Sequence, residues 1–154
     1  MHIEFFVQGE PKASPRPRAR AIKRGNKWVA QIYESKGNAK PWMDLITLTA
    51  KQYMPLRQIQ GAVRCERTFY IPRPKSHFGT GRNADVLKKS APVMHTQKPD
   101  IDNYGKAVLD AITESGLWRD DCIVVGGEPC KQWAFNKHKY GVSIAIDTLE
   151  DCDG

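Results

Sequence analysis

The sequence predicts one α+β domain, with a small mixed or antiparallel sheet and two main helices packed on one face of it. Alternating apolar and polar stretches, typical of strands, are interspersed with two segments whose apolar residues recur every three to four positions. A chain of 154 residues with 40% hydrophobic content is long enough to form one hydrophobic core and too short for two domains of typical size. We expect the domain to cover residues 1–148, followed by an acidic, flexible tail at 149–154.

The strand-like stretches alternate or are rich in residues that favour strands. We expect strands at 2–7, 28–33, 61–71, 122–125, 128–136 and 139–147. The alternation is clearest at 61–71, where the odd-numbered residues Val63, Cys65, Arg67, Phe69 and Ile71 share one side. The stretch 128–136 is the expected partner of 139–147.

Two segments have helical periodicity. In 38–53 the pattern includes Trp42, Leu45 and Ile46, and Pro55 ends it. In 100–113 the apolar residues are Ile101, Tyr104, Val108, Leu109 and Ile112. Pro99 opposes any earlier start of this second helix, because a proline lacks the backbone N–H and restricts the residue before it.

Two segments are expected to be loops. Residues 11–18 hold three prolines between cations, which predicts a stiff loop. Residues 73–98 are basic and show little periodicity, so a long loop or a weak helix is expected there.

Acidic residues gather around the second helix, although the net charge of the chain is +7. Asp100 and Asp102 are spaced by one residue, Lys106 follows one turn later, and the pair Asp120-Asp121 comes after a helix-length gap. Residues two apart on a helix do not face each other, so the first two can share an ion only if Asp100 lies at the helix cap or just before it. Mg²⁺ suits such a set, because it takes a few carboxylates and keeps other positions for water and phosphates.

An ordinary structural role explains the same residues. Asp100 could cap the helix, Asp102 and Lys106 could form a surface ion pair, and Asp120-Asp121 could belong to a turn. A D-x-D pair is a short pattern with frequent false positives. From the residues alone, a metal site and capping with solvated charge are equally open.

The run KPDIDNYGKAVLDAI at 98–112, followed by GLWRDD at 116–121, resembles the active-site signature of the RusA-type Holliday junction resolvases. These are small Mg²⁺-dependent endonucleases of bacteria and their phages. By the matching motif, the functional residues of that family fall on Asp100, Asp102, Lys106 and Asp121, with Asp120 adjacent. A weaker resemblance covers the Pro-, Lys- and Arg-rich segment 9–20. The pair Tyr104-Gly105 departs from the family, which usually has bulkier apolar residues there.

The resemblance implies a Mg²⁺-dependent enzyme, with Mn²⁺ as a substitute, that cuts four-way DNA junctions in recombination and repair. Asp100, Asp102 and Asp121 would hold the ion, with Asp120 beside them, and Lys106 would stabilise charge in the transition state. A four-way junction must be cut in two strands, so a homodimer with one site per subunit is expected.

The charge distribution supports a nucleic-acid partner independently. The chain has 24 Lys and Arg against 17 acids, and clustered cations gain affinity by displacing counterions from DNA. Seven Lys or Arg and no acid lie between Lys12 and Lys27, with Trp28 immediately after. The candidate DNA-binding residues are Lys12, Arg16, Arg18, Arg20, Lys23, Arg24 and Lys98.

Two other functions fit part of the pattern. A non-catalytic nucleic-acid-binding module would use the basic stretches and Trp28, and a phosphohydrolase of small nucleotides would use only the acids. The four cysteines show no zinc-binding spacing, and no apolar run approaches the ~18 residues of a membrane span. We therefore expect a cytoplasmic protein, and the family resemblance implies a bacterial cell, with the protein encoded by the bacterium or by a phage.

Overall fold

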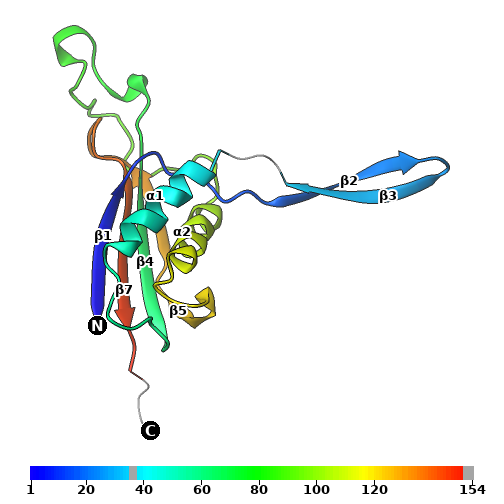
Figure 1. The fold of residues 1–154 in the computed structure, drawn as a ribbon. Helices are drawn as coiled ribbons and strands as arrows, with labels where there is room; N and C mark the ends of the chain where they lie inside the picture. Colours follow the sequence, from blue (N-terminus) through cyan, green and yellow to red (C-terminus); the bar gives the residue numbers. More distant parts are fainter. Residues whose placement is uncertain (35–37, 151–154) are drawn as a thin grey trace.

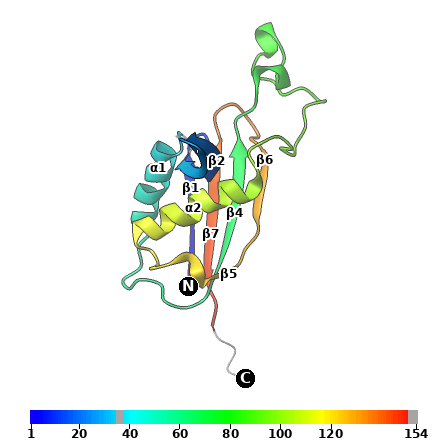
Figure 2. The ribbon, with the colours of Figure 1, turned by 90° about the vertical axis from the view of Figure 1, so that its right-hand side faces the viewer.

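A computed structural model describes residues 1–34 and 38–150 and has the α+β architecture that the sequence predicts (Figures 1 and 2). In chain order the helices and strands are β1 (His2–Gln8), β2 (Pro17–Arg24), β3 (Lys27–Glu34), α1 (Lys40–Lys51), β4 (Val63–Ile71), α2 (Ile101–Ser115), β5 (Val124–Gly126), β6 (Pro129–Trp133) and β7 (Gly141–Thr148). Short 3₁₀ turns cover Lys75–His77, Gly81–Asn83 and Asp121–Ile123. Of the predicted tail, residues 151–154 lie outside the described part.

The main sheet is mixed. Strand β7 lies between β1 and β4 and is antiparallel to both, whereas β5 and β6 pair with β4 in parallel. The predicted pairing of 128–136 with 139–147 is therefore wrong, since β6 runs along β4 from Arg67↔Pro129 to Ile71↔Trp133. The reason is that both edges of β7 are already taken by the longer strands β1 and β4.

Both helices cover the same face of this sheet, as predicted (Figure 2). Strand β4 alternates between buried and more exposed residues, so its odd-numbered side chains face the helices. Tyr104 of α2 is 3% exposed and stacks on Phe69 with ring centroids 5.2 Å apart. Thr47 of α1 donates a hydrogen bond of 3.0 Å to the carbonyl of Ala111 and so links the two helices.

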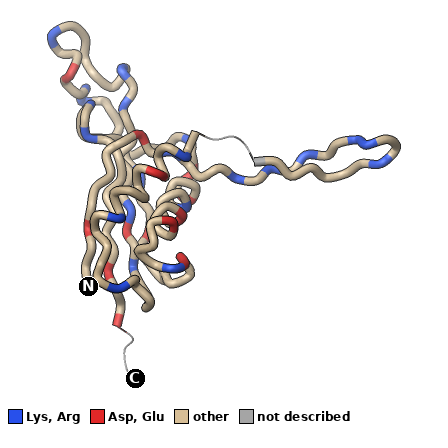
Figure 3. Tube along the Cα trace, in the orientation of Figure 1, with Lys and Arg blue, Asp and Glu red and all other residues tan. Residues whose placement is uncertain are grey.

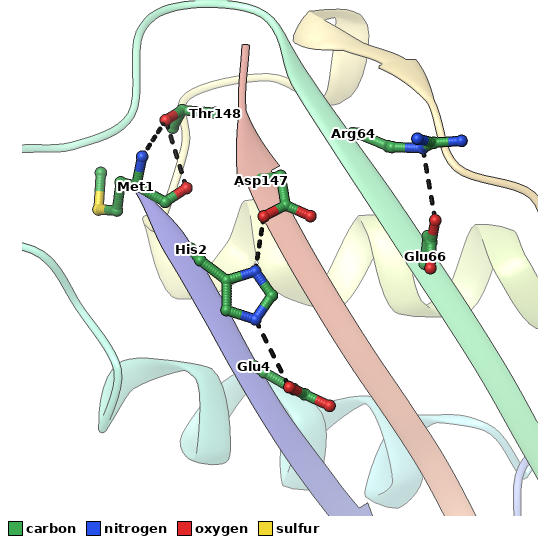
Figure 4. Close-up of polar contacts among 7 residues, drawn as sticks. All are labelled: Met1, His2, Glu4, Arg64, Glu66, Asp147 and Thr148. Carbon is green, nitrogen blue, oxygen red and sulfur yellow. Dashed lines mark hydrogen bonds and ion pairs between the residues drawn. The ribbon is translucent and has the colours of Figure 1, made fainter.

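The other face of the sheet carries polar side chains on β1, β7 and β4 (Figure 4). His2 Nδ1 is 2.6 Å from Asp147 Oδ1 across the β1–β7 ladder, and Arg64 Nε is 3.4 Å from Glu66 Oε1 on β4. An antiparallel sheet with one face on the core and one in solvent shows this alternation.

Strands β2 and β3 form a separate hairpin, here called the arm, that projects from the domain (Figure 1). The stretch 17–24 was expected to begin in a stiff loop and was not predicted as a strand, so this part of the prediction is wrong. Gly25 takes a φ of 60° in the two-residue turn that closes the arm. A left-handed glycine at the first position of such a turn suits the twist of a hairpin.

Residues 73–98 form a loop, as predicted, with two 3₁₀ turns inside it. Arg73 anchors the loop, because its Nε donates to the carbonyl of Ala134 at 2.6 Å and its Nη1 to that of Pro92 at 2.7 Å. Within residues 1–34 and 38–150, no helix is long and apolar enough to cross a membrane.

Candidate active site

Helix α2 begins as the sequence predicts. Asp100 occupies the N-cap position with extended backbone angles, φ −68° and ψ 148°, and its side chain makes no capping hydrogen bond. Its main-chain carbonyl accepts from the N–H of Asn103 at 3.1 Å instead. The carboxylate of Asp100 is therefore not used for capping, contrary to the purely structural interpretation.

Two neighbouring segments hold this helix start in place. Lys131 of β6 donates to the carbonyl of Gln97 at 2.5 Å and to that of Pro99 at 2.8 Å, on either side of Lys98. From the N-terminal side, the N–H of Ser14 donates to the carbonyl of Asn103 at 3.1 Å. Three segments far apart in sequence thus meet at the start of α2.

Asp102 and Arg16 are brought together across 86 residues of sequence. Arg16 Nη2 lies 2.5 Å from Asp102 Oδ2, and the two side chains are 56% and 66% exposed. A residue predicted to bind DNA is therefore paired with one predicted to bind metal. Because both side chains are more than half exposed, solvent screens the pair and its net contribution to stability is small.

Lys106 does not pair with Asp102. Its Nζ lies 3.1 Å from Asp110 Oδ1, one turn further along α2. The surface pair of Asp102 with Lys106 that the structural interpretation required is wrong. Lys106 is four residues from Asp102 and four from Asp110, so helix geometry allows either pair. Asp102 already faces Arg16, which leaves Asp110 as the partner of Lys106.

The pair Asp120-Asp121 lies where the chain leaves α2 and enters β5. Asp120 Oδ1 accepts the backbone N–H of Cys122 at 2.8 Å, and this hydrogen bond lowers the pKa of the Asp120 carboxyl. Asp121 begins the 3₁₀ turn that delays β5 until Val124, two residues later than predicted. The neighbouring acids therefore differ, since the Asp120 side chain caps the turn whereas Asp121 is its first residue.

The acidic residues have the right chemistry for Mg²⁺, which prefers carboxylate oxygens. In the described part of the chain, no group of three or more His, Cys, Asp or Glu side chains is arranged to hold an ion. One candidate carboxylate, that of Asp102, pairs with the guanidinium of Arg16.

A cavity of about 340 Å³ opens between the base of the arm and the start of α2. Its lining residues are Ala13, Ser14, Pro15, Arg16, Arg18, Lys98, Pro99, Asp100 and Asn103. Three cations and one carboxylate therefore line one concave surface. Lys12 lines an adjoining cavity, and its Nζ lies 3.2 Å from Glu10 Oε1. Of the other predicted DNA-binding residues, Arg20, Lys23 and Arg24 lie along the arm (Figure 3).

The Tyr104-Gly105 pair has a packing explanation. A Cβ at Gly105 would lie 3.3 Å from Arg67 Nη1 and 3.5 Å from the Cβ of Pro129, so α2 approaches β4 and β6 closely at this point. Arg67 is 6% exposed, and its Nη2 donates to the carbonyl of Gly127 at 2.6 Å. Burial lowers the pKa of this guanidinium.

The family model described as endodeoxyribonuclease RusA matches residues 8–147. The chain belongs to the RusA endodeoxyribonuclease family. It is also 34% identical over 123 residues to the uncharacterized protein YqaN of Bacillus subtilis (strain 168), a match that covers 80% of this chain and 82% of that protein. Membership confirms the resemblance drawn from the two motif runs and places the chain among nucleases that cut DNA internally.

Within this RusA-family chain, the sequence missed residues that support the site. Lys131 was assigned no role, and nothing in its local pattern indicates that it holds the segment before α2. Arg67 was placed on the buried side of its strand, but its position beneath Gly105 depends on a contact between distant segments. The arm had a usable signal, because a Gly-Asn pair at 25–26 between two strand-like stretches is typical of a hairpin.

Proposed function

We propose that this RusA-family protein is a Mg²⁺-dependent endonuclease that resolves four-way (Holliday) DNA junctions by paired phosphodiester cleavage, in DNA recombination and repair. One observation carries the proposal beyond family membership: the acidic start of α2 and the base of the basic arm share a single cavity. The carboxylate of Asp100 therefore adjoins the cations that would hold a phosphodiester backbone.

The metal would be held by Asp100, Asp102 and Asp121, with Asp120 beside them, and Mn²⁺ would substitute for Mg²⁺. When bound, such an ion supplies an acidified water and neutralises charge on the scissile phosphate. Asp102 would have to exchange Arg16 for the ion. The exposure of this ion pair supports the exchange, since solvated pairs contribute only about 0–1 kcal/mol.

The basic side chains around the cavity would position the DNA. Arg16, Arg18 and Lys98 line the cavity and would hold phosphate oxygens near Asp100. Lys106 is 58% exposed on α2, and its ammonium would stabilise the negative charge that develops during attack. Lys12, Arg20, Lys23 and Arg24 would contact the backbone further away.

The protein would act as a homodimer on branched DNA in the cytoplasm of a bacterial cell. Resolution requires cuts in two strands of like polarity, so two equivalent sites related by a twofold axis match the symmetry of the junction. Twofold dimers are also the commonest closed assemblies of identical chains.

A synthetic mobile four-way junction tests the proposal. We expect paired nicks that convert the junction to linear duplexes in Mg²⁺ or Mn²⁺, none in EDTA, and none in a duplex of the same sequence. Tight junction binding without cleavage in either metal would instead support a non-catalytic binding module. Hydrolysis of free nucleotides without junction cleavage would support a small-molecule phosphohydrolase.

A further inference from the structure

The two faces of the arm differ in chemistry. In an antiparallel ladder, directly opposed residues point to the same side. One side, the basic face, carries the opposed pairs Arg18↔Tyr33, Arg20↔Gln31, Ile22↔Val29 and Arg24↔Lys27. The other side, the tryptophan face, carries Ala19↔Ile32, Ala21↔Ala30 and Lys23↔Trp28.

The basic face is organised by contacts within the arm. Arg20 Nε donates to Gln31 Oε1 at 2.9 Å, and its guanidinium lies 5.3 Å from the ring centroid of Tyr33. These contacts hold the guanidinium in a defined position. The arginines of this face therefore suit the regularly spaced phosphates of a DNA backbone.

The tryptophan face exposes large apolar side chains beside the tip of the arm. Trp28 is 70% exposed and Ile32 is 75% exposed, whereas the other three tryptophans, Trp42, Trp118 and Trp133, are 0–6% exposed. Among the described residues, no aromatic pair and no cation–π contact includes Trp28. The next opposed pair on this face is Ala21↔Ala30. Because both side chains are small, they leave the side of the indole that faces them uncovered.

The charges on the arm decide between classes of partner. Strands β2 and β3 and the turn between them carry five Lys or Arg and one acid, Glu34 at the far end from the tip. Lys23 faces Trp28 directly across the ladder. A partner at this tip must therefore offer negative charge beside a flat apolar surface. An unstacked nucleotide offers both, because every base has a π-face and carries a phosphate.

We propose that Trp28 is a base-stacking residue that covers a nucleobase left unstacked at the branch point of the DNA. The inference rests on the proposed function, which supplies a branched substrate. Inside a duplex both faces of each base pair are covered by neighbouring pairs, whereas stacking is interrupted where strands exchange. The arm thus carries two kinds of contact: the basic face holds phosphates and Trp28 distinguishes a branch from a duplex.

Binding of the full-length protein in EDTA, where no cleavage is expected, tests this assignment. Trp28→Ala should weaken junction binding about 5- to 150-fold, which corresponds to roughly 1–3 kcal/mol for one base–aromatic stack, while duplex binding changes little. The log–log salt dependence should stay the same, because stacking releases no counterions. Trp28→Phe should recover most of the affinity.

Two further measurements complete the test. A 2-aminopurine placed at the branch point should change its fluorescence on binding wild-type protein and much less on binding Trp28→Ala. Phe135→Ala is the matched control, because Phe135 is 64% exposed but lies off the arm, and it should bind the junction as wild type does.

Several results would overturn the assignment. Unchanged junction affinity in Trp28→Ala would do so while leaving the resolvase proposal intact, provided that wild type binds and cuts junctions. Equal weakening on duplex and junction would show that Trp28 contacts a groove and not a branch. A shift from dimer to monomer in sedimentation would show that the tryptophan face packs against a second copy. Failure of wild type to bind junctions would remove both proposals together.

Discussion

The arm and the start of α2 differ in charge and in how many contacts with the rest of the domain hold them. The arm pairs only with itself in the main-chain ladders, and its charged residues are cations except for Glu34. The start of α2 is held from three sides, by Lys131, by Ser14 and by the stacking of Tyr104 on Phe69. It carries two of the four candidate acids, Asp100 and Asp102. Under the proposed function, DNA capture would lie on a weakly supported extension and chemistry on a fixed base, with Arg16 between them.

This division has a thermodynamic basis. An isolated two-stranded hairpin is at best marginally stable in water, so the arm can adapt to DNA at little cost to the domain. Catalytic groups must be held close to one geometry, since small displacements slow a reaction steeply. Substitutions in the two regions should therefore separate binding from rate.

The largest separation is expected for Asp102→Asn. The change keeps the size of the side chain but removes the charge that attracts the ion, so we expect cleavage to fall to background. Junction binding should persist or tighten, because the substitution removes a carboxylate near the phosphates and releases Arg16 from its pair. Single-turnover cleavage and a binding titration, performed on the same preparation, measure the two effects.

Asp44→Asn is the matched control, since Asp44 is also an exposed aspartate on a helix with a cationic partner, Lys40. It should cleave as wild type does. Retained nicking by Asp102→Asn would contradict the assignment, and equal loss of binding and cleavage would indicate misfolding.

A smaller rate effect is expected for Lys106→Ala. Removing one group that stabilises negative charge in the transition state typically slows catalysis ~10²-fold or more, while the affinity for the substrate in its ground state stays nearly unchanged. Lys40→Ala is the matched control, because Lys40 makes the equivalent i,i+4 pair with Asp44 on α1. Cleavage of a prebound junction isolates the step. If both variants stay within about threefold of wild type, well short of the expected ~10²-fold loss, Lys106 is only a surface cation.

The arm should show the converse behaviour. Arg18→Ala combined with Arg20→Ala should weaken binding to all DNA and reduce the log–log salt slope by about 0.9 for each duplex phosphate that the protein no longer neutralises. The cleavage rate of prebound junction should fall far less than in Asp102→Asn, because Arg18 and Arg20 would hold the DNA backbone and neither would hold the metal ion. Affinity measured over a range of salt concentrations checks this. An unchanged slope would show that these arginines do not contact DNA.

The same contrast governs what the sequence could predict. The start of α2 was predictable because its signals are local: Pro99 limits the helix on one side, and the apolar period continues from Ile101 to Ile112. Strand β4 was predictable because its period of two continues over the whole strand, with Arg67 the one charged residue on the apolar side. Resemblance to a family supplied the roles proposed for the acids, which spacing alone left open.

The remaining features depend on contacts between distant segments. The parallel pairing of β6 with β4 could not be inferred from 128–136, because the same alternation fits either neighbour. The contact of Arg16 with Asp102 joins residues 86 apart. Strand β2 of the arm was missed for a different reason, although β3 was predicted at 28–33: more than half of the residues of β2 are Lys, Arg or Pro, and a strand that faces no core shows no run of large apolar residues.

The smallest expected effect tests whether the two regions are independent. Arg16→Gln removes the cation that faces Asp102, so that a metal ion no longer has to displace it. The exposed pair contributes at most about 1 kcal/mol, which corresponds to roughly fivefold tighter Mn²⁺ binding without DNA, measured by calorimetric titration. Arg24→Gln, beside the turn of the arm, removes the same charge far from Asp102 and should leave Mn²⁺ affinity unchanged. Weaker Mn²⁺ binding by Arg16→Gln would show that the arginine organises the carboxylates and does not compete with the ion, and the arm would then take part in building the metal site.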